Sequence, residues 1–553
     1  PVRNSSNPTH RRAPQVAWHR GVFVPADPTR SMPRLYPNGI NGATGAPLLQ
    51  IDIAAASQIV TYVPTNQTEQ QREEALHQLH TTKQEHVRQE HLGVVFGIDE
   101  DKLDESLWAV VVNDRDPADL LKALLPLIEH RSREQGIILP PLTFREGETC
   151  GNWYARHVPN PNVPWQTRPP VLLYRSGETT ERWLQRHSVS QGPVDPRRGV
   201  PFYLLLLGQP GDLGSNAGRP SIPFLFQYEL DMFWSVGRLC FTDAQGQHCY
   251  ADYTAYAERV VAFEGATPAY QKQVAFFGPR HETDLATQLS ADKLITPLVH
   301  GYNGQAGIAE RNGFAQHVLL GPDATRSNLE AVLRGTSTRP ALLFGASHGV
   351  GFPADDARLL AHQGALLCQD WTGFGSIRRE HWLAGEDLTS DTRMDGLIAF
   401  LFACYGAGCP QEDQFVFEVN GNGSTRRPFI APYDMIAQLP QRMLAHGCLA
   451  VLGHIDRAWS HSFDEQGIPA QTQAFEDVLN RILAGKRLGF ATDQFNVRQA
   501  ALSSLLANEL ENISFGKNVP ATALVALWEA RNDARNYALL GDPAVRLPIE
   551  RMA

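Results

Sequence analysis

The sequence predicts an α/β protein with a mainly parallel sheet flanked by helices, and three observations predict it. Residues 341–344 and 397–402 are short apolar runs bounded by glycine, as expected for strands buried on both faces of a parallel sheet. From about residue 200 onward, such runs alternate with helical patterns. The chain has 553 residues, 42% of them hydrophobic and 20% charged, which is typical of a globular protein with two or three domains.

Composition and periodicity divide the chain into four parts. Residues 1–50 are rich in proline, glycine, asparagine and arginine, which predicts an extended N-terminal arm. Residues 51–199 include a strand pattern at 106–112 and a helix that begins near Asp116, which predicts an accessory α/β region. Residues 200–268 begin with the buried strand PFYLLLLG and predict a smaller α/β subdomain, and residues 269–553 form the largest part.

Strands and helices are expected to alternate from residue 250 to the end of the chain. The predicted strands lie at 274–277, 294–299, 341–344, 397–402 and 449–452. The predicted helices lie at 252–263, 284–289, 328–333, a short stretch ending near 445, 474–483, 497–510 and 521–540.

Charge and cysteine content exclude several classes of protein. A net charge of −10 and a pI near 6 argue against a primary nucleic-acid binder, which normally shows a basic face. No apolar run approaches the ~20 residues needed to span a bilayer, and the first residues as given contain no secretory h-region. Seven thinly spread cysteines form no disulfide framework. We therefore expect a soluble protein in a reducing, cytoplasmic compartment.

Two reactive residues follow the two glycine-bounded strands. His348 and Cys404 would lie just past the carboxyl ends of those strands, where open α/β sheets place their active crevices. A thiolate needs a neighbouring imidazole, which lowers the thiol pKa and later protonates the leaving amine. The backbone N–H groups of Gly349 and Cys404 could form an oxyanion hole. The alternative is an inert core cysteine with a satisfied loop histidine, and the paired motifs, 56 residues apart, make it less favoured.

These motifs carry a family resemblance. ASHG at 346–349 and ACYGAG at 403–408 resemble the caspase-fold (clan CD) cysteine peptidases, most of all the gingipain-like branch. The stretches LLLLG, IPFLFQYELD, VGRL and LLGDPAVRLP are also similar to gingipain-type catalytic domains, so the resemblance covers roughly residues 200–550. The caspase motif is met in part: Phe402 stands where caspases carry glutamine, and Tyr405 where they usually carry arginine.

The resemblance implies a cysteine endopeptidase with a caspase-like sheet beside a smaller gingipain-type subdomain. Cys404 would attack the peptide carbonyl, and His348 would serve as base and then as acid through a thioester intermediate. In such domains the loop after the third strand lines the S1 pocket, which makes Trp459 a candidate wall residue; the alternative is a packed interior tryptophan. A basic P1 residue would need a negative charge, for which the candidates are Glu412, Asp413 and, as a rival, Asp370.

The biological expectation is limited, regulated cleavage of a partner protein, with bacterial defence or cell death as one hypothesis. A regulatory partner is expected to dock on the N-terminal region. No cofactor is expected, and although the family often binds calcium, the sequence has no EF-hand pattern, so no metal is expected either.

Other interpretations remain open. The chain could be a catalytically inert caspase-like scaffold, or a ligand-gated hydrolase that uses the glycine-rich loop 208–214. That loop lacks the Lys-Ser/Thr of a P-loop. Four histidines within 66–91 (77, 80, 86 and 91) could suggest a metal site, but a solvated helix face is favoured because their spacing forms no closed ligand set. Cys409, five positions after Cys404, is a weak candidate for a metal or redox partner.

Overall fold

The computed structural model divides into two compact units, Pro1–Arg34 and Leu35–Ala553, and all residues described below belong to the second unit. The structure describes residues 38–48, 93–160, 164–211, 220–243, 245–266, 272–302, 304–336, 339–416, 418–419, 425–464 and 470–552. Most of the predicted N-terminal arm, the polar stretch 66–91 with its four histidines and residues 212–214 of the glycine-rich loop lie outside these ranges.

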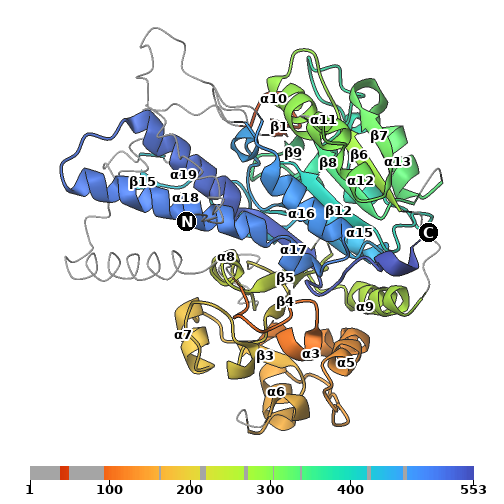
Figure 1. Cartoon of the computed structure of the whole chain (residues 1–553), viewed down its shortest axis with the longest axis vertical. Helices are drawn as coiled ribbons and strands as arrows, with labels where there is room; N and C mark the ends of the chain where they lie inside the picture. Colours follow the sequence, from red (N-terminus) through yellow and green to blue (C-terminus); the bar gives the residue numbers. More distant parts are fainter. Residues whose placement is uncertain are drawn as a thin grey trace, which may run out of the picture. The chain divides into compact units, whose positions relative to one another are not determined.

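Ten strands form one large sheet in the order β3-β2-β4-β5-β18-β17-β12-β8-β6-β7. All neighbouring strands are parallel except β17 and β18, so the two halves of the sheet run in opposite directions. Helices flank the sheet (Figure 1). The predicted fold class is therefore confirmed, and the arrangement is consistent with a caspase-like fold.

The strands of the large sheet are short, and most are buried along their whole length. Their bounds are β2 Trp108–Asn113, β3 Val171–Tyr174, β4 Tyr203–Leu207, β5 Ser235–Leu239, β6 Gln273–Gly278, β7 Ala315–Leu320, β8 Leu342–Ala346, β12 Ile398–Phe402, β17 Ala450–His454 and β18 Tyr537–Gly541. β2 and β3 come from the predicted accessory region, β4 and β5 from residues 200–268, and β2 pairs directly with β4. The first two α/β regions thus contribute to one continuous sheet.

A second sheet of four short strands carries the segment that matters most for the site. Its order is β1-β9-β10-β11, with bounds Gly39–Asn41, Gly349–Gly351, Ala365–Leu367 and Trp382–Leu383. β1 pairs in parallel with β9, although the two strands lie 310 residues apart in the chain. Two further pairs are β13 Gly408–Cys409 with β16 Met435–Ile436, and β14 Glu418–Val419 with β15 Thr425–Arg426.

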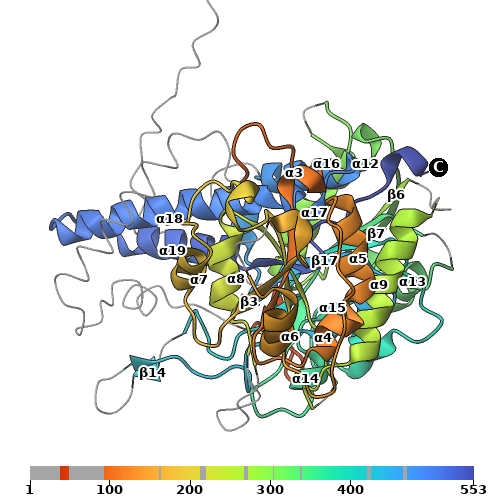
Figure 2. The same cartoon turned by 90° about the horizontal axis from the view of Figure 1, so that it is seen from below.

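The helices surround the large sheet, and several pack directly on each other. Figure 2 shows α5 and α9 side by side, and both figures show α18 and α19 as a pair. No helix in the described part of the chain is long and apolar enough to cross a membrane. The helix bounds are α3 Leu103–Ser106, α4 Asp119–Ala123, α5 Leu125–Glu134, α6 Cys150–His157, α7 Thr180–Arg186, α8 Phe224–Asp231, α9 Tyr250–Gly265, α10 Leu285–Leu289, the π-helix η3 Ser290–Ile295, α11 Thr296–His300, α12 Ile308–Arg311, α13 Arg326–Leu333, α14 Leu359–His362, α15 Gln438–Ala445, α16 Gln473–Leu483, α17 Leu488–Ala491, α18 Asp493–Ser514 and α19 Ala521–Arg535.

Three predicted elements are wrong. The expected strand at 294–299 is helical, because a short apolar run fits a buried helix as well as a strand. The expected helix at 521–540 ends at Arg535, and its apolar tail becomes β18 between β17 and β5. Asp116 does not cap a helix: α4 begins at Asp119, and burial raises the pKa of the Asp116 carboxyl to about 8.

An aromatic cluster holds the two central strands in place. The rings of Phe344 in β8 and Phe400 in β12 lie 5.1 Å apart between centroids, and Phe475 of α16 stacks on Phe400 at 5.8 Å. All three side chains are fully buried. Each such aromatic group contributes about 1.5–3 kcal/mol by leaving water, so β8 and β12 have a rigid support behind their carboxyl ends.

Candidate active site

His348 and Cys404 follow two neighbouring parallel strands. β8 and β12 are in register from Leu342↔Ile398 to Ala346↔Phe402. Two residues beyond those paired ends the chain reaches His348 on one strand and Cys404 on the other. Parallel neighbours end at the same edge of a sheet, so both residues lie at that edge.

The chain turns sharply after Cys404. Tyr405 has a φ of 58°, a left-handed conformation that is uncommon for an aromatic residue and costs backbone strain. Its N–H donates to the carbonyl of Asp456 at 2.9 Å, which holds the turn. Strain of this kind is concentrated at functional sites, and here it positions the nucleophile candidate.

Gly349 packs directly on the backbone of Cys404. A Cβ at position 349 would lie only 1.7 Å from the Cys404 carbonyl oxygen, so only glycine fits there. The N–H groups of Gly349 and Cys404 both donate to a single acceptor, the carbonyl oxygen of Asn38, each at 2.9 Å. Two backbone donors that converge on one peptide oxygen beside a thiol have the geometry of an oxyanion hole.

His348 is oriented by a carboxylate that the sequence analysis did not single out. Its Nε2 lies 2.7 Å from Oδ2 of Asp284, and its Nδ1 has no hydrogen-bond partner in the described structure. Asp284 is the N-cap of α10 and also accepts hydrogen bonds from Thr287 at 3.3 Å (N–H) and 2.8 Å (hydroxyl). Burial opposes ionisation of Asp284, but the imidazole and these hydrogen bonds outweigh it and hold the carboxyl pKa well below its usual range. The sequence signal was the aspartate that begins the predicted helix at 284.

The Cys404 thiol is fully buried. The Ala458 N–H donates to Sγ at 3.3 Å, an interaction that favours the thiolate. Burial is the larger effect and raises the thiol pKa well above its usual value. Gly39 is among the groups that cover the sulfur, since a Cβ on Gly39 would lie 2.6 Å from Sγ.

The loop after β17 forms one wall beside the thiol. Arg457 makes two hydrogen bonds to Asp413, at 2.7 and 2.9 Å, and the pair is buried. The backbone N–H of Trp459 donates to Oδ1 of Asp533 in α19 at 2.9 Å. The Trp459 ring packs on Phe415 with centroids 5.3 Å apart. Trp459 is completely buried, so the placement agrees with the packed-tryptophan alternative, while its neighbour Ala458 presents backbone groups to the site.

Two of the three candidate specificity acids, Asp413 and Asp370, have other partners. Asp413 is paired with Arg457, and Asp370 accepts from the N–H of Arg326 at 2.7 Å, at the start of α13. Glu412 is exposed and lines a separate cavity of about 380 Å³ together with three arginines, Arg427, Arg531 and Arg535. Asn38 is the residue whose carbonyl oxygen accepts from the Gly349 and Cys404 N–H groups. In the described chain, none of the three acids makes a hydrogen bond with Asn38.

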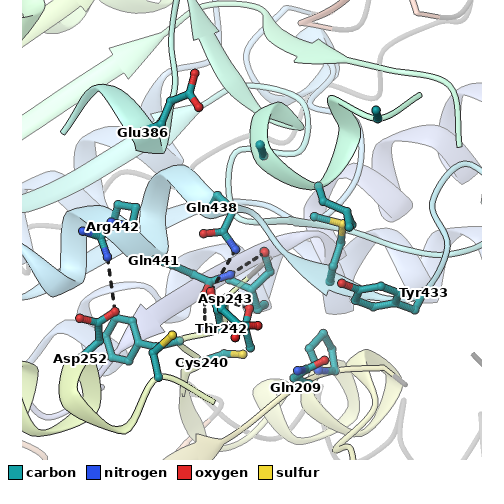
Figure 3. A pocket seen from close by; sticks show the side chains of 18 residues that line it. Gln209, Cys240, Thr242, Asp243, Asp252, Glu386, Tyr433, Gln438, Gln441 and Arg442 are labelled. Atoms are coloured by element: carbon teal, nitrogen blue, oxygen red, sulfur yellow. Dashed lines mark hydrogen bonds and ion pairs between the residues drawn. The ribbon is translucent and has the colours of Figure 1, made fainter. Parts of the chain in front are cut away.

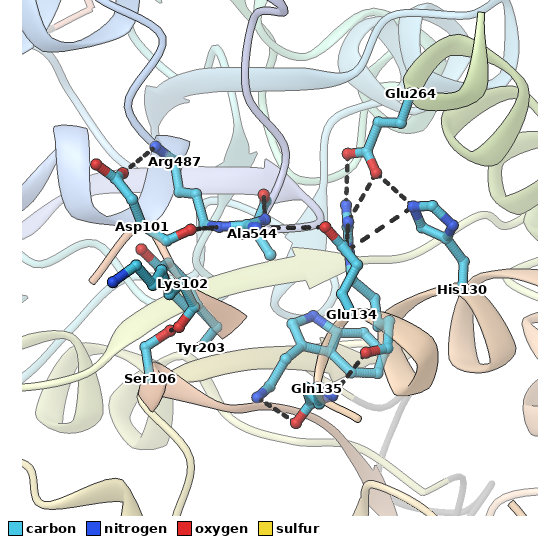
Figure 4. Close-up of polar contacts among 12 residues, drawn as sticks. Asp101, Lys102, Ser106, His130, Glu134, Gln135, Tyr203, Glu264, Arg487 and Ala544 are labelled. Carbon is cyan, nitrogen blue, oxygen red and sulfur yellow. Dashed lines mark hydrogen bonds and ion pairs between the residues drawn. The ribbon is translucent and has the colours of Figure 1, made fainter. Parts of the chain in front are cut away.

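All seven cysteines have free thiols. Cys409 accepts a hydrogen bond from Gln363 at 3.4 Å and lies in the short strand β13. One group could offer metal ligands: within the described ranges, His130, Glu134 and Glu264 have ligand atoms within 4.8 Å of one another. The guanidinium of Arg131 already bridges both carboxylates, which makes the cluster an ion-pair network. Figure 4 shows His130, Glu134 and Glu264 around these contacts.

Another cavity lies apart from these residues. It has a volume of about 590 Å³ and includes Gln209 and Pro210 of the glycine-rich loop (Figure 3). Among the residues that line it, Arg442 is the one cation, and it pairs with Asp252 at 3.4 Å. Asp243 and Glu386 add further negative charge. A phosphate site needs converging donors or cations, so this lining does not favour nucleotide binding.

Comparisons with known proteins identify no family. No family model matches the sequence, and no curated protein matches it. One similar solved structure, titled as a protease, covers 80% of this chain and 78% of its own length at 11% identity and a TM-score of 0.40. Another, the separase–securin complex of Saccharomyces cerevisiae, covers 65% of this chain and 17% of its own length at 8% identity and a TM-score of 0.27. The functional proposals below depend on the geometry of the site.

Proposed function

We propose that this protein is a cysteine endopeptidase with Cys404 as nucleophile and His348 as general base and acid. The observation that carries the proposal is the convergence of the Gly349 and Cys404 N–H groups on one peptide carbonyl oxygen beside the thiol. Such donors stabilise the negative charge that develops on that oxygen when a nucleophile adds to the carbonyl. An inert scaffold would have no need for this arrangement.

The reaction proceeds in two steps. His348 takes the thiol proton, the sulfur of Cys404 bonds to the carbonyl carbon, and the peptide C–N bond breaks as the imidazolium protonates the leaving amine. Water then attacks the thioester with the same histidine as base, which releases the acid and restores the thiol. The unpartnered Nδ1 of His348 is the nitrogen available for these proton transfers, because Nε2 is held by Asp284.

Two groups assist this pair without reacting. Asp284 fixes the orientation of the imidazole and stabilises its protonated form, in the way an acid supports the histidine of other dyads and triads. The Ala458 N–H stabilises the thiolate. Of the acids named for a basic P1 residue, Asp413 and Asp370 are paired with other groups and Glu412 lines a separate cavity, so a preference for lysine or arginine is not part of this proposal.

We further propose a protein substrate that is cleaved at few positions. Strand β9 pairs with an extended segment next to Cys404, and extended pairing of this kind selects unfolded or looped stretches of a folded partner. A docking partner for the N-terminal region, a cytoplasmic location and a role in bacterial defence stay predictions from the sequence.

The peptidase proposal is tested by replacing Cys404 and, as a control, the buried Cys409 five positions later. Cys404→Ala should abolish hydrolysis of a fluorogenic peptide library, by at least about 10³-fold, and should remove labelling by a peptide with a thiol-reactive warhead. Cys409→Ala, also fully buried, should retain both. Each measurement is repeated in a Gly39→Ala background, because the added methyl group collides with Sγ and displaces the segment that covers it.

The contrary result is equally clear. If the Cys404→Ala chain hydrolyses peptides as fast as the unmodified chain, the peptidase proposal is wrong. If neither the unmodified nor the Gly39→Ala chain hydrolyses any peptide, the scaffold interpretation replaces it.

A further inference from the structure

The segment 38–48, called here the covering segment, folds back on itself over the site. β1 pairs in parallel with β9, with Gly39 opposite Gly349. A tight turn follows, in which the Gly45 N–H donates to the Asn41 carbonyl and the Asn41 N–H to the Ala46 carbonyl, both at 2.9 Å. The return arm closes with a hydrogen bond from the Leu48 N–H to the Gly39 carbonyl at 3.1 Å. The segment thus binds the site as an ordered peptide.

The backbone of Asn38 is held on both sides. Its N–H donates to the Ala458 carbonyl at 2.8 Å, and its carbonyl oxygen accepts from Gly349 and Cys404. Gly39 comes next and lies against Sγ. The peptide carbonyl in the oxyanion hole is therefore the one that joins Asn38 to Gly39, which is the position of a scissile bond.

The Asn38 side chain is buried against Ser290. It is 1% exposed, its Nδ2 donates to Oγ of Ser290 at 2.5 Å, and its Oδ1 has no hydrogen-bond partner in the described structure. Ser290 is fully buried and donates its own hydroxyl proton to the Ala286 carbonyl at 3.0 Å. Since that proton is already used, the oxygen presents lone pairs to Asn38 and requires a donor from it.

This arrangement discriminates among side chains by chemistry and size. An aspartate would place a buried negative charge, with acceptors only, against an acceptor oxygen. Glutamine, lysine and arginine are longer and would need space that the buried Ser290 occupies. Ser290 is the first residue of the π-helix η3, which packs on β6 and β8. This packing limits any movement of Ser290 that would make room for a longer side chain. π-Helical turns are frequent at functional sites.

We propose that this chain is its own substrate: Cys404 cleaves the Asn38–Gly39 bond, and Ser290 selects asparagine as the residue whose carbonyl is attacked. The inference rests on the proposed peptidase function and adds its substrate class. The Cys404 sulfur bonds to the Asn38 carbonyl carbon, and the C–N bond to Gly39 breaks. The Gly39 nitrogen takes a proton from His348, and water then converts the thioester into the Asn38 carboxylate and the free thiol.

Cleavage would also relieve a block. Before it, the covering segment excludes other peptides from the oxyanion hole and buries the thiol. After it, Asn38 and Gly39 are separate chain ends, so the segment from Gly39 onward is no longer tethered to the residue in the oxyanion hole. The two ends can leave separately, and the site opens to other asparagine-containing peptides.

The first experiment follows the mass of the purified full chain over time. The unmodified and Cys409→Ala chains should yield a fragment that begins at Gly39, and Cys404→Ala should not, which also reports any cleavage that does not need the thiol. Asn38→Asp and Asn38→Gln should each slow this cleavage by at least about tenfold. Cleavage of the Cys404→Ala chain at the unmodified rate, or equal rates for all residues at position 38, would overturn the proposal.

The second experiment measures specificity on added peptides with the Gly39→Ala chain. Peptides with asparagine before the cleaved bond should be hydrolysed at least about tenfold faster, in kcat/KM, than those with aspartate, glutamine or arginine. Ser290→Ala should reduce that preference by about tenfold, mainly through KM. Ser132→Ala is the matched control, because Ser132 is also buried and bonds a carbonyl four residues back, at Ile128.

The outcomes separate this inference from the proposed function. Hydrolysis by Cys404 after arginine or lysine but not after asparagine would retain the peptidase and overturn the asparagine preference. Hydrolysis of added asparagine peptides without any cut at Asn38–Gly39 would overturn self-cleavage. The absence of any thiol-dependent hydrolysis would overturn both.

Discussion

Two buried networks in this protein each pair a carboxylate with a nitrogen base, and they differ in how completely they are paired. Arg131 donates from Nε to Asp542 and from a terminal nitrogen to Glu264, both at 2.7 Å, with Glu134 as a third partner. His348 contacts Asp284 at 2.7 Å through one nitrogen, and the structure assigns no hydrogen bond to the other.

The difference separates a network that stabilises the fold from one that keeps an unpartnered nitrogen. In both, burial disfavours the charged carboxylate, but the nitrogen partner and the hydrogen bonds outweigh burial, so the pKa values of Glu264 and Asp284 fall. Each nitrogen of the Arg131 guanidinium makes at least one hydrogen bond, and a network paired in this way rigidifies a core. The spare nitrogen of His348 is buried without a partner, which has a free-energy cost and agrees with the role proposed for it.

The largest effect should come from removing the spare nitrogen. His348→Ala should lower peptidase kcat by about 10³-fold, because general acid–base groups contribute 10²–10⁴-fold. His130→Ala, which removes an imidazole from the Arg131 network, should leave kcat within about twofold. The kcat of the two variants, measured in the Gly39→Ala background, tests this. A similar loss of kcat in both variants would show that the two networks do not differ in function.

The Arg131 network should appear in stability instead of activity. The pKa of Glu264 is about 2: burial opposes ionisation, but Arg131 and the hydrogen bond from His130 outweigh it. A depressed carboxyl pKa stabilises the fold above the unfolded pKa, and the stabilisation is lost as pH falls toward the folded value. Glu264→Gln should therefore lower the free energy of unfolding by roughly 3 kcal/mol at pH 7.

Denaturant titrations at several pH values check this effect. The gap between Glu264→Gln and the unmodified chain should narrow as pH falls from about 4.5 to about 2. A gap that stays constant over this window would show that the substitution acts through packing. Hydrolysis by the folded variant should be unaffected.

Asp284→Asn should have the opposite effect from Glu264→Gln: activity should fall, and stability should change little. Asparagine is as good an N-cap as aspartate, so α10 should persist and stability should change by less than about 1 kcal/mol. Without the negative charge the protonated imidazole loses its support, and kcat should fall by about 10- to 100-fold with little change in KM. If KM rises and kcat stays constant, Asp284 acts on peptide binding and not on His348.

The smallest effect should come from the open cavity of Figure 3. Arg442→Ala removes a partly exposed ion pair with Asp252, 3.4 Å apart, and such pairs contribute at most about 1 kcal/mol. Both self-cleavage and peptide hydrolysis should stay within about twofold. A loss of activity here would connect this cavity to the site and revive the ligand-gated interpretation.

Some parts of the site could be predicted from the sequence because they are local. The runs at 341–344 and 397–402 become β8 and β12: each is a short apolar run bounded by glycine, a pattern that favours a buried strand, whereas the apolar run at 294–299 forms a helix. Glycine is required after His348 because the Cys404 backbone lies against position 349, and this glycine is visible in the sequence motif. The specificity acids could not be assigned, because the partner of a carboxylate such as Asp413 depends on which arginine packs beside it.

The sequence by itself determined the fold class and the two strand-end motifs that carry His348 and Cys404. Both depend on local patterns, in which consecutive residues form a short apolar run that ends at glycine. Only the tertiary structure decided that Asp284 holds the imidazole, that the Asn38 carbonyl accepts from the Gly349 and Cys404 N–H groups, and that Ser290 receives the Asn38 side chain across 252 residues of chain. Hydrogen-bond partners that far apart are chosen by how the elements pack, and no local pattern encodes that packing.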